Sequence, residues 1–486
     1  MSPTPVSSLP ILSGPVSSPA WAILVTLLYI VLAASVTVDV LLKKSDVRGA
    51  LGWIGAAWFS PILGGLLYYM FGINLVTRRA LKMGRKRART GRSSGHDQPP
   101  DAPDHIRNLL EVSERVTTCS LTAGNALTML EGGDAVYPQM LAAIAAAEKS
   151  IVMASYVFRN DKAGNQFADA LIAAKARGVA VRVLLDSVGI GYFRPIIYHR
   201  MQRGGVFAAR FLHTWLPWRM PFLNMRNHRK ILVVDGRLAF TGGMNVGAEN
   251  SKSPHPKDYI LDIHFRVEGP VVRQVMDAFA RDWSFTTEEV LDEDFWWPKL
   301  KEAGDIYARG VSSGPDADIY KLEMILGAAL NAAKKHIRIL TPYFLPDARL
   351  QFAIALAGLR GVRVDIVIPE RCNYLVMDWA MRAHLRFFSH IAANIYTTPQ
   401  PFDHSKLCTV DGSWSLIGSS NWDARSFRLN FEFDLECYDP VLTKKLEGMI
   451  DDRIGRAKRL DVKALTKRPI PVRLRDAAAR LMMPYL

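Results

Sequence analysis

Residues 228–245 have the sequence HRKILVVDGRLAFTGGMN, and residues 404–421 have the related sequence HSKLCTVDGSWSLIGSSN. Counted from the first His of each stretch, a Lys stands at +2, an Asp at +7, a Gly followed by Gly or Ser at +14 and +15, and an Asn at +17. One such stretch alone would be explained by a surface strand that ends in an Asp-Gly turn. Because all the spacings recur together, we infer a duplication that builds one site from two half-sites.

The residues shared by the two stretches are of types that can carry chemistry. The two stretches together supply two imidazoles, two ammonium groups, two carboxamides and, from the second stretch, a hydroxyl, a set that suits transfer of a phosphoryl-centred group without a metal. One imidazole would attack phosphorus, while the other would protonate the leaving alcohol and later deprotonate the incoming one. The candidates for this chemistry are His228, Lys230 and Asp235 in the first stretch, and His404, Lys406 and Asp411 in the second.

Polar side chains at the end of each stretch are candidates for binding the phosphate. With the two lysines, Asn245, Ser419 and Asn421 could surround phosphate oxygens and stabilise the charge that develops in the transition state. The first stretch has Gly243 where the second has Ser419, so the hydroxyl is present on one side only.

Four carboxylates follow or belong to the two stretches. Asp262 comes 34 residues after the His of the first stretch, and Glu432 comes 28 residues after the His of the second. A carboxylate that accepts a hydrogen bond from the far ring nitrogen would fix the tautomer of each His, and we expect these two in that supporting role. Asp235 and Asp411 each precede a Gly at an expected turn. A role in holding that turn is at least as well supported as a catalytic one.

No known metal or nucleotide motif accompanies these residues. The chain has no Walker-type glycine loop, no Gly-x-Ser-x-Gly and no spacing typical of zinc or magnesium ligands. Its four cysteines form no Cys-x-x-Cys pair. We therefore expect no metal and no cofactor.

Charge and length narrow the class of protein. A chain of 486 residues should contain two to three domains. The apolar fraction of 49% and the charged fraction of 22% are ordinary, but the net charge of +15 is not. It favours an anionic partner, either nucleic acid or an acidic lipid surface.

Residues 1–92 are predicted to anchor the chain to a membrane. Apolar segments at about 20–42 and 50–73 are each long enough for a bilayer core of ~30 Å. A signal peptide competes for the first, and a re-entrant or interfacial segment for the second, which contains Pro61. Eight basic residues follow between positions 78 and 92, which predicts that the next domain faces the cytoplasm. Residues 93–105 have the composition of a flexible linker.

The remainder is predicted to be α/β. Apolar, β-branched runs alternate with helical segments twice over, which indicates two similar units with parallel or mixed sheets. We expect one unit at 106–303 and the other at 304–450, with their His residues meeting across a pseudo-two-fold interface. Residues 451–486 are predicted to form a basic, amphipathic tail, either on a membrane surface or packed on its own domain.

The paired HxKxxxxD motifs, each followed by G[GS]xN, resemble those of the phospholipase D superfamily. The resemblance implies two pseudo-symmetric domains that form one site, with a phosphohistidine formed on His228 and with His404 as general acid. The two apolar segments, the phrases FSPILGGLLYYMFG and TPYFLPD, and the C-terminal sequence are similar to the bacterial cardiolipin synthase family. That family implies transfer of a phosphatidyl group from one phosphatidylglycerol to another, with release of glycerol, at the bacterial inner membrane. Phosphatidylglycerol and anionic membrane lipids would then be the partners, and nucleic acid would not.

Three alternative functions are consistent with parts of this pattern. A phospholipase D-type hydrolase or transphosphatidylase would use water or another alcohol as acceptor. A nuclease of the same superfamily would also suit the positive charge, but it would have no need of two apolar segments. A non-enzymatic membrane-binding protein is disfavoured because both motifs keep His, Lys and Asn.

Overall fold

A computed structural model describes residues 19–44, 46–72, 99, 103–117, 119–214, 225–252, 259–315 and 318–483. The chain divides into a small N-terminal unit, whose described residues lie within 19–72, and a large unit that contains both HxKxxxxD motifs. The basic run between positions 78 and 92 lies outside the described residues. So does the predicted linker at 93–105, apart from residues 99 and 103–105.

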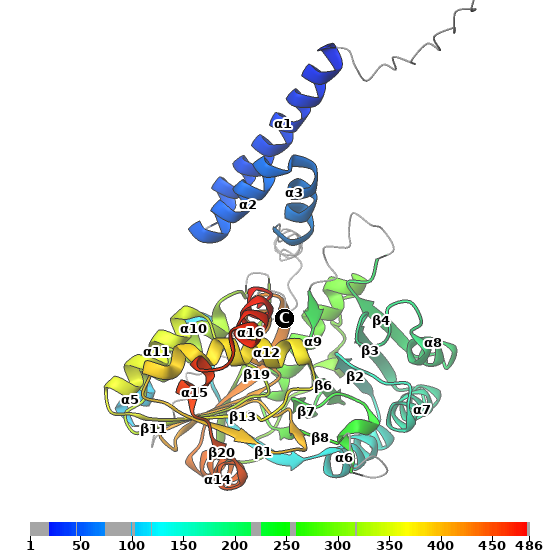
Figure 1. The fold of residues 1–486 in the computed structure, drawn as a ribbon. Helices are drawn as coiled ribbons and strands as arrows, with labels where there is room; N and C mark the ends of the chain where they lie inside the picture. The colour runs from blue at the N-terminus through cyan, green and yellow to red at the C-terminus, as the bar shows by residue number, and fades with distance from the viewer. Residues whose placement is uncertain are drawn as a thin grey trace, which may run out of the picture. The chain divides into compact units, whose positions relative to one another are not determined.

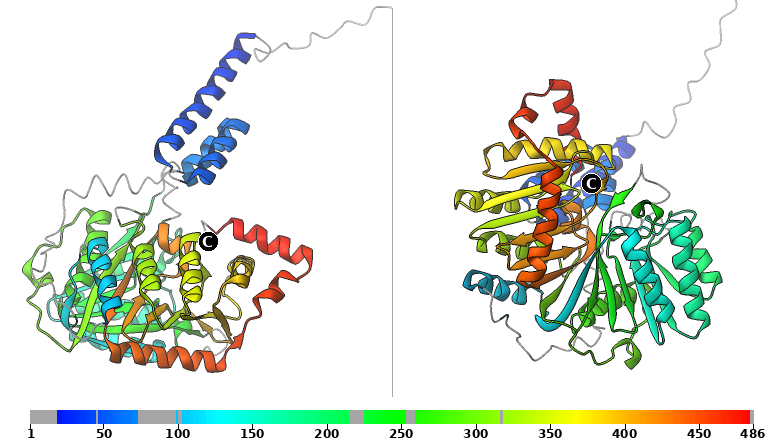
Figure 2. Two further views of the ribbon diagram at one scale, coloured as in Figure 1. Left: turned by 90° about the vertical axis from the view of Figure 1, so that its left-hand side faces the viewer. Right: turned by 90° about the horizontal axis from the view of Figure 1, so that it is seen from below.

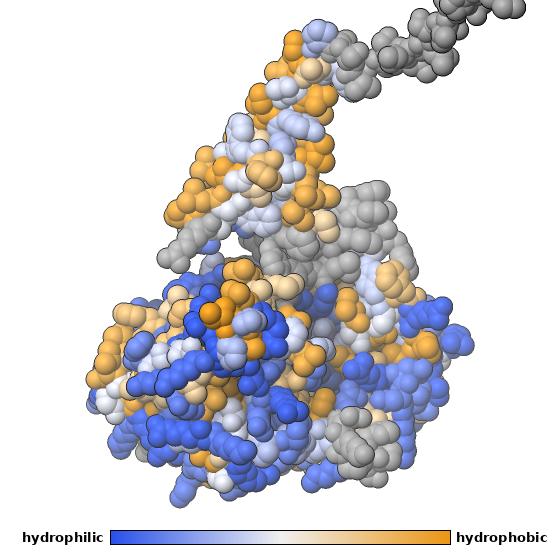
Figure 3. All heavy atoms as spheres, in the orientation of Figure 1, coloured by the Kyte–Doolittle hydropathy of each residue, from blue (hydrophilic) through white to orange (hydrophobic). Residues whose placement is uncertain are grey.

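The N-terminal unit consists of three α-helices and a π-helical turn (Figure 1). Within the described residues, α1 is the one helix that is long and apolar enough to cross a membrane, and Figure 3 shows hydrophobic side chains over this unit. The second apolar segment is divided at Ser60–Pro61, since proline cannot donate the amide that would continue a helix. It is therefore not one spanning helix. The elements are α1 (Pro19–Lys43), α2 (Val47–Phe59), α3 (Pro61–Leu67) and η2 (Tyr68–Gly72).

The one acid within α1 has its partners inside this unit. The Asp39 carboxylate accepts a hydrogen bond from the Tyr68 hydroxyl at 2.8 Å and forms an ion pair with Lys43. Both partners lie near the end of the apolar run, so the charge is compensated close to where the helix would leave a bilayer.

The large unit is built on one 16-stranded sheet with an internal two-fold order. From the centre outward the first half runs β1, β9, β7, β6, β2, β3, β4, and the second half runs β10, β19, β17, β16, β11, β13, β14. β1 and β10 pair antiparallel at the centre, and β2, β3 and β4 pair parallel, as do β11, β13 and β14. β20 (Lys458–Arg459) adds an antiparallel strand at the edge beside β14. The first-half strands are β1 (Thr122–Glu131), β2 (Ser150–Ser155), β3 (Ala180–Asp186), β4 (Phe207–Phe211), β6 (Ile231–Val234), β7 (Leu238–Gly242) and β9 (Ile263–Glu268). The second-half strands are β10 (Ile306–Ser313), β11 (His336–Leu340), β13 (Arg363–Pro369), β14 (Asn394–Thr398), β16 (Leu407–Val410), β17 (Trp414–Gly418) and β19 (Asn430–Tyr438).

Helices cover both halves of this sheet (Figure 2). One core belongs to each half, and a third core is shared. The shared core joins Phe279 of α9 and Ile450 of α14 to strands from both halves, so the two halves are packed as one body. The helices are α5 (Asp104–Thr117), α6 (Gly133–Ala146), α7 (Lys162–Ala176), α8 (Ile196–Arg203), α9 (Val272–Thr287), α10 (Lys321–Ala332), α11 (Ala348–Leu359), α12 (Leu375–Leu385), α13 (Ala424–Arg428), α14 (Pro440–Arg456), α15 (Val462–Thr466) and α16 (Ile470–Leu481).

The helices at the two ends of the large unit both pack on its second half. α5 was expected in the first half, but its residues Ile106 and Leu109 belong to the core of the second half, where α5 packs against α10. α16, from the predicted amphipathic tail, packs against α12 through buried Asp476 and Ala479. It leaves Leu474 exposed, so the helix is docked on its own unit and still presents apolar surface.

Candidate active site

Short strands that cross between the halves bring the two motifs together. β5 (Arg226–Asn227) pairs with β19 of the other half, and the amide of His228 then donates to the Phe431 carbonyl at 2.9 Å. β15 (Phe402–Asp403) pairs with β8 (Ile260–Leu261) in the same way, and the amide of His404 donates to the Leu261 carbonyl at 2.7 Å. Each His therefore lies beside the residue that precedes a carboxylate of the opposite half.

The result is a crossed pair of imidazole–carboxylate contacts. His228 Nδ1 lies 2.8 Å from Glu432 Oε2, and His404 Nδ1 lies 2.7 Å from Asp262 Oδ2. Both carboxylates are buried, and engagement of Nδ1 leaves Nε2 as the nitrogen available to a substrate. The two carboxylates predicted to support the His residues are thus in contact with them, each from the other half of the chain.

Burial makes both imidazoles poor bases in the resting site. Removal from water lowers the pKa of His228 and of His404, and the adjacent lysines act in the same direction. Burial would raise the pKa of Glu432 and of Asp262, but the neighbouring cationic groups outweigh it and lower both. Near neutral pH, each pair is therefore an ionised carboxylate that holds a neutral imidazole.

The two lysines of the motifs are buried beside the imidazoles. Lys230 Nζ donates to the His228 carbonyl at 2.6 Å, and Lys406 Nζ lies 2.8 Å from His404 Nδ1. Burial lowers the pKa of Lys230 to about 7 and that of Lys406 to about 8, and Glu432 opposes part of this shift in both. An anionic phosphate in the site would favour their charged forms.

Asp235 and Asp411, which are candidates for the catalytic set, are not among the residues that line the cavity with the two imidazoles. The Asp235 carboxylate accepts hydrogen bonds from the backbone amides of residues 148–150 at 2.7–3.0 Å. The Asp411 carboxylate accepts those of residues 334–336 at 2.7–2.8 Å, and His105 contacts it as well. Both aspartates have a positive φ of 51° at the turn. The geometry favours the loop-holding role, because every carboxylate oxygen is already engaged by the backbone.

The glycine and serine positions support the carboxylates. Ser419 was expected on the phosphate, but it is fully buried and its hydroxyl donates to Glu432 Oε2 at 2.6 Å. At the corresponding position, a Cβ added to Gly243 would lie 2.3 Å from Asp262 Oδ1. The side chain of Asp262 is shorter than that of Glu432, so its carboxylate lies closer to the backbone of the motif. It occupies the space at Gly243 that a serine side chain would fill, which accounts for Gly in the first motif and Ser in the second.

The asparagines do reach the site. Asn245 and Asn421 line the same cavity as the two imidazoles, as predicted for phosphate contacts. Asn245 Oδ1 accepts from the amide of Val157 at 3.2 Å, which fixes its carboxamide. Asn421 Oδ1 is buried and accepts no hydrogen bond from the part of the chain that the structure describes.

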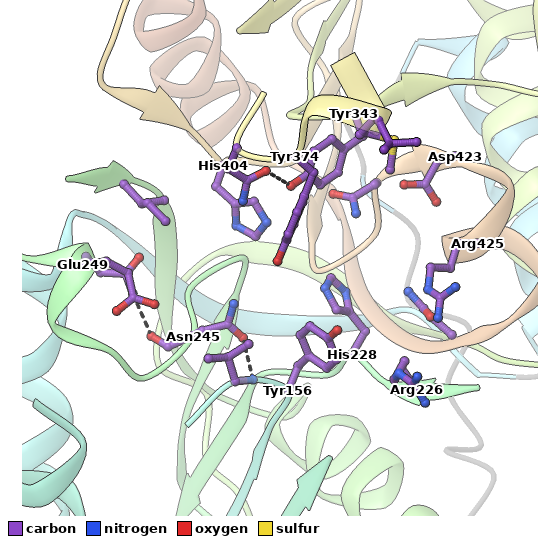
Figure 4. A pocket seen from close by; sticks show the side chains of 18 of the residues that line it. Tyr156, Arg226, His228, Asn245, Glu249, Tyr343, Tyr374, His404, Asp423 and Arg425 are labelled. Atoms are coloured by element: carbon purple, nitrogen blue, oxygen red, sulfur yellow. Dashed lines mark hydrogen bonds between the residues drawn. The ribbon is translucent and has the colours of Figure 1, made fainter. Parts of the chain in front are cut away.

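The cavity has a volume of about 520 Å³ and contains groups that the motif analysis missed (Figure 4). The ring of Tyr156 lies 4.9 Å from that of His228, and the ring of Tyr343 lies 6.3 Å from that of His404. Both tyrosines follow the first strand of a βαβ unit, in SYVF and TPYF, which was the signal available in the sequence. The cavity is also lined by Arg226, Asn373, Tyr374, Asp423 and Arg425.

Comparisons with known proteins agree with this architecture. A family described as "Cardiolipin synthase, PLD-like domain" matches residues 140–283 and 326–454, and one described as "Phospholipase D-nuclease N-terminal" matches residues 31–72. A cardiolipin synthase of Oceanobacillus iheyensis is 30% identical, covering 94% of this chain and 97% of that protein. The major cardiolipin synthase ClsA of Bacillus subtilis is 28% identical, covering 96% and 99%. A solved phosphatidylserine synthase of Haemophilus influenzae, at 16% identity, has a TM-score of 0.60 over 78% of this chain and 100% of that chain, which shows the fold alone.

Two pseudo-symmetric halves whose HxKxxxxD motifs face one cavity define the class of phospholipase D-like proteins. Within that class, the chain belongs to the cardiolipin synthase family. It is a phosphatidyltransferase that acts on phospholipids, and it is associated with a membrane.

Proposed function

We propose that the protein joins two molecules of phosphatidylglycerol into cardiolipin and glycerol through a phosphohistidine intermediate. The observation that carries this proposal is the crossed arrangement in the cavity, where His228 and His404 are each oriented by a carboxylate of the opposite half. Two oriented imidazoles at one phosphorus supply a nucleophile and a general acid–base without a metal.

In the first step, Nε2 of His228 attacks the phosphorus of phosphatidylglycerol. The P–N bond forms and the P–O bond to the headgroup glycerol breaks, while His404 donates a proton to the departing oxygen. Although burial lowers the pKa of His404 in the empty site, the phosphate anion beside it raises that pKa and favours the proton. Lys230, Lys406 and the two asparagines stabilise the equatorial oxygens in the transition state.

In the second step, a headgroup hydroxyl of another phosphatidylglycerol attacks the same phosphorus. Its proton passes to His404, which is neutral after the first step, and the P–N bond to His228 breaks. Cardiolipin leaves and both imidazoles return to their starting state. The cycle consumes no water and needs no cofactor.

The rim of the cavity suits a lipid acceptor better than water. Tyr374 and Leu375, where α12 begins, line the cavity and yet are 65% and 68% exposed. Exposed apolar side chains at a cavity mouth are suited to contact with acyl chains or the bilayer interface. Together with α1, this favours a reaction at the membrane surface, and we propose the cytoplasmic face of the bacterial inner membrane.

The test is the lipid product formed by the purified protein in mixed micelles of phosphatidylglycerol alone. We expect cardiolipin and free glycerol in equal amounts. Phosphatidic acid as the sole lipid product would show a hydrolase instead. Replacement His228→Ala should abolish both products, and acid-labile phosphorus on His228 in the rapidly quenched unmodified protein would identify the intermediate.

A further inference from the structure

The cavity wall beside His228 carries two arginines that the proposed chemistry does not use. Arg226 belongs to β5, two residues before His228, and Arg425 belongs to α13 of the opposite half. Both line the cavity, and Figure 4 shows them together on the side of His228 that faces away from Glu249. The pairing of β5 with β19 places Arg226 opposite Asn430, five residues after Arg425 in the chain.

The two arginines place two like charges beside one cavity in the free protein. Burial lowers the pKa of Arg425, the charge of Arg226 lowers it further, and the charges of Asp423 and Asp186 oppose part of this shift. The Tyr156 hydroxyl lies within the field of both guanidinium groups. A bound anion would remove this repulsion and would receive charge-assisted hydrogen bonds from both.

The acidic groups near the arginines also have hydrogen-bond or ion-pair partners of their own. Glu249 is paired with Arg159 at 3.1 Å. The Asp423 carboxylate accepts the amide of Ser426 at 2.7 Å, and burial raises its pKa to about 6. Asp186, the other acid whose charge acts on Arg425, is buried and accepts three backbone amides. The carboxylates near the two arginines are therefore bound by other groups as well, and both guanidinium groups belong to the cavity wall beside His228.

We propose that Arg226 and Arg425 form a second phosphate subsite, which binds the phosphate of the acceptor lipid while its headgroup hydroxyl attacks. This inference rests on the proposed function and adds the class of acceptor. A glycerol headgroup joins the attacking oxygen to its own phosphate through three carbons. A phosphatidylglycerol acceptor thus presents an anion near the reacting phosphorus, whereas water and a simple alcohol do not.

The subsite determines the acceptor and leaves the bonds that form and break unchanged. The hydroxyl oxygen of the acceptor forms the new P–O bond, the P–N bond to His228 breaks, and the hydroxyl proton goes to His404. The Arg pair holds the second phosphate throughout and takes no proton. It is a specificity device for an acceptor that carries its own phosphodiester.

The experiment supplies the full-length protein with phosphatidylglycerol micelles and ethanol together, and measures cardiolipin against phosphatidylethanol. Loss of one charged hydrogen-bonding group should lower the ratio of cardiolipin to phosphatidylethanol by about tenfold or more in Arg226→Gln and in Arg425→Gln. Arg226→Lys keeps the charge and loses the planar guanidinium group, so its ratio of cardiolipin to phosphatidylethanol should lie between those of the unmodified protein and Arg226→Gln. Arg428→Gln is the matched control, because Arg428 lies on the same helix, is exposed and pairs with Asp347.

Several outcomes would overturn the subsite. A parallel fall of both products would show that the arginines serve the reacting phosphate, and an unchanged ratio in both Gln variants would show that they bind no acceptor. Formation of phosphatidylethanol by each variant reports that the protein is folded. If the unmodified protein makes no cardiolipin, the proposed function fails, whatever the variants do. If the unmodified protein makes cardiolipin and both Gln variants keep its ratio of products, the proposed function stands and only the subsite is refuted.

Discussion

Replacement of Lys230 with Met should stabilise the protein while it removes activity. Lys230 is buried, and its pKa is about 7 in the folded protein against 10.5 for an ordinary lysine. This shift of 3.5 pKa units, at 1.36 kcal/mol each, means that holding the ammonium in the folded state costs about 5 kcal/mol when it is fully charged. Methionine has a similar length and carries no charge to desolvate.

The pH dependence follows from proton linkage. Between pH 7 and 10.5 the unfolded chain binds more protons at this position than the folded one, so the penalty falls as the pH rises. The penalty is about 4 kcal/mol at pH 7 and about 2 kcal/mol at pH 9. Against it stands the lost hydrogen bond to the His228 carbonyl, worth about 1 kcal/mol. The expected gain is thus about 3 kcal/mol at pH 7 and about 1 kcal/mol at pH 9.

The assay is thermal or denaturant unfolding of the detergent-solubilised protein at both pH values, together with cardiolipin formation. Turnover should fall by about 100- to 1,000-fold, because a charge that stabilises the transition state is lost. Lys444→Met, on the exposed face of α14, is the matched control and should change neither quantity. The reasoning would be refuted if Lys230→Met unfolded more easily than the unmodified protein at pH 7, or if its gain in the free energy of unfolding were larger at pH 9 than at pH 7.

Three further substitutions separate supporting groups from reacting ones. Gly243→Ala should reduce turnover by about 100-fold, since its Cβ would displace the Asp262 carboxylate that orients His404. Gly448→Ala is the control, because a Cβ at Gly448 has no atom within 4 Å, and it should leave turnover unchanged in the same lipid assay. Asp235→Ala should lower the free energy of unfolding by about 2 to 4 kcal/mol, because three backbone amides lose their acceptor, while turnover per folded molecule should persist. Loss of turnover with an unchanged free energy of unfolding would contradict the loop-holding role. His404→Ala should remove cardiolipin formation while leaving membrane attachment intact, as measured by flotation with vesicles, and retained synthesis would exclude it as the general acid–base.

Much of the site could be predicted from the chain alone. The repeated spacing identified both imidazoles, both lysines and both asparagines, and all six lie in or beside one cavity. The duplication also predicted the two-fold α/β architecture that the order of the strands confirms. These features are local or periodic, so a linear pattern preserves them.

Other assignments depended on neighbours that are remote in sequence. Ser419 and Asp411 belong to the same repeated pattern as the two imidazoles, yet Ser419 supports a carboxylate and Asp411 holds a turn. No periodicity distinguishes a hydroxyl that faces a cavity from one that faces Glu432. The arginine pair was missed because neither Arg226 nor Arg425 belongs to a repeated position.

The sequence by itself determined that one motif occurs twice, that an α/β fold surrounds the two copies and that an apolar segment precedes them. Only the tertiary structure decided which carboxylate orients which imidazole, because β5 and β15 each pair with a strand of the opposite half. Hydrogen bonds between strands depend on the three-dimensional register of the two halves, and that register is set by the shared core packed between α9 and α14.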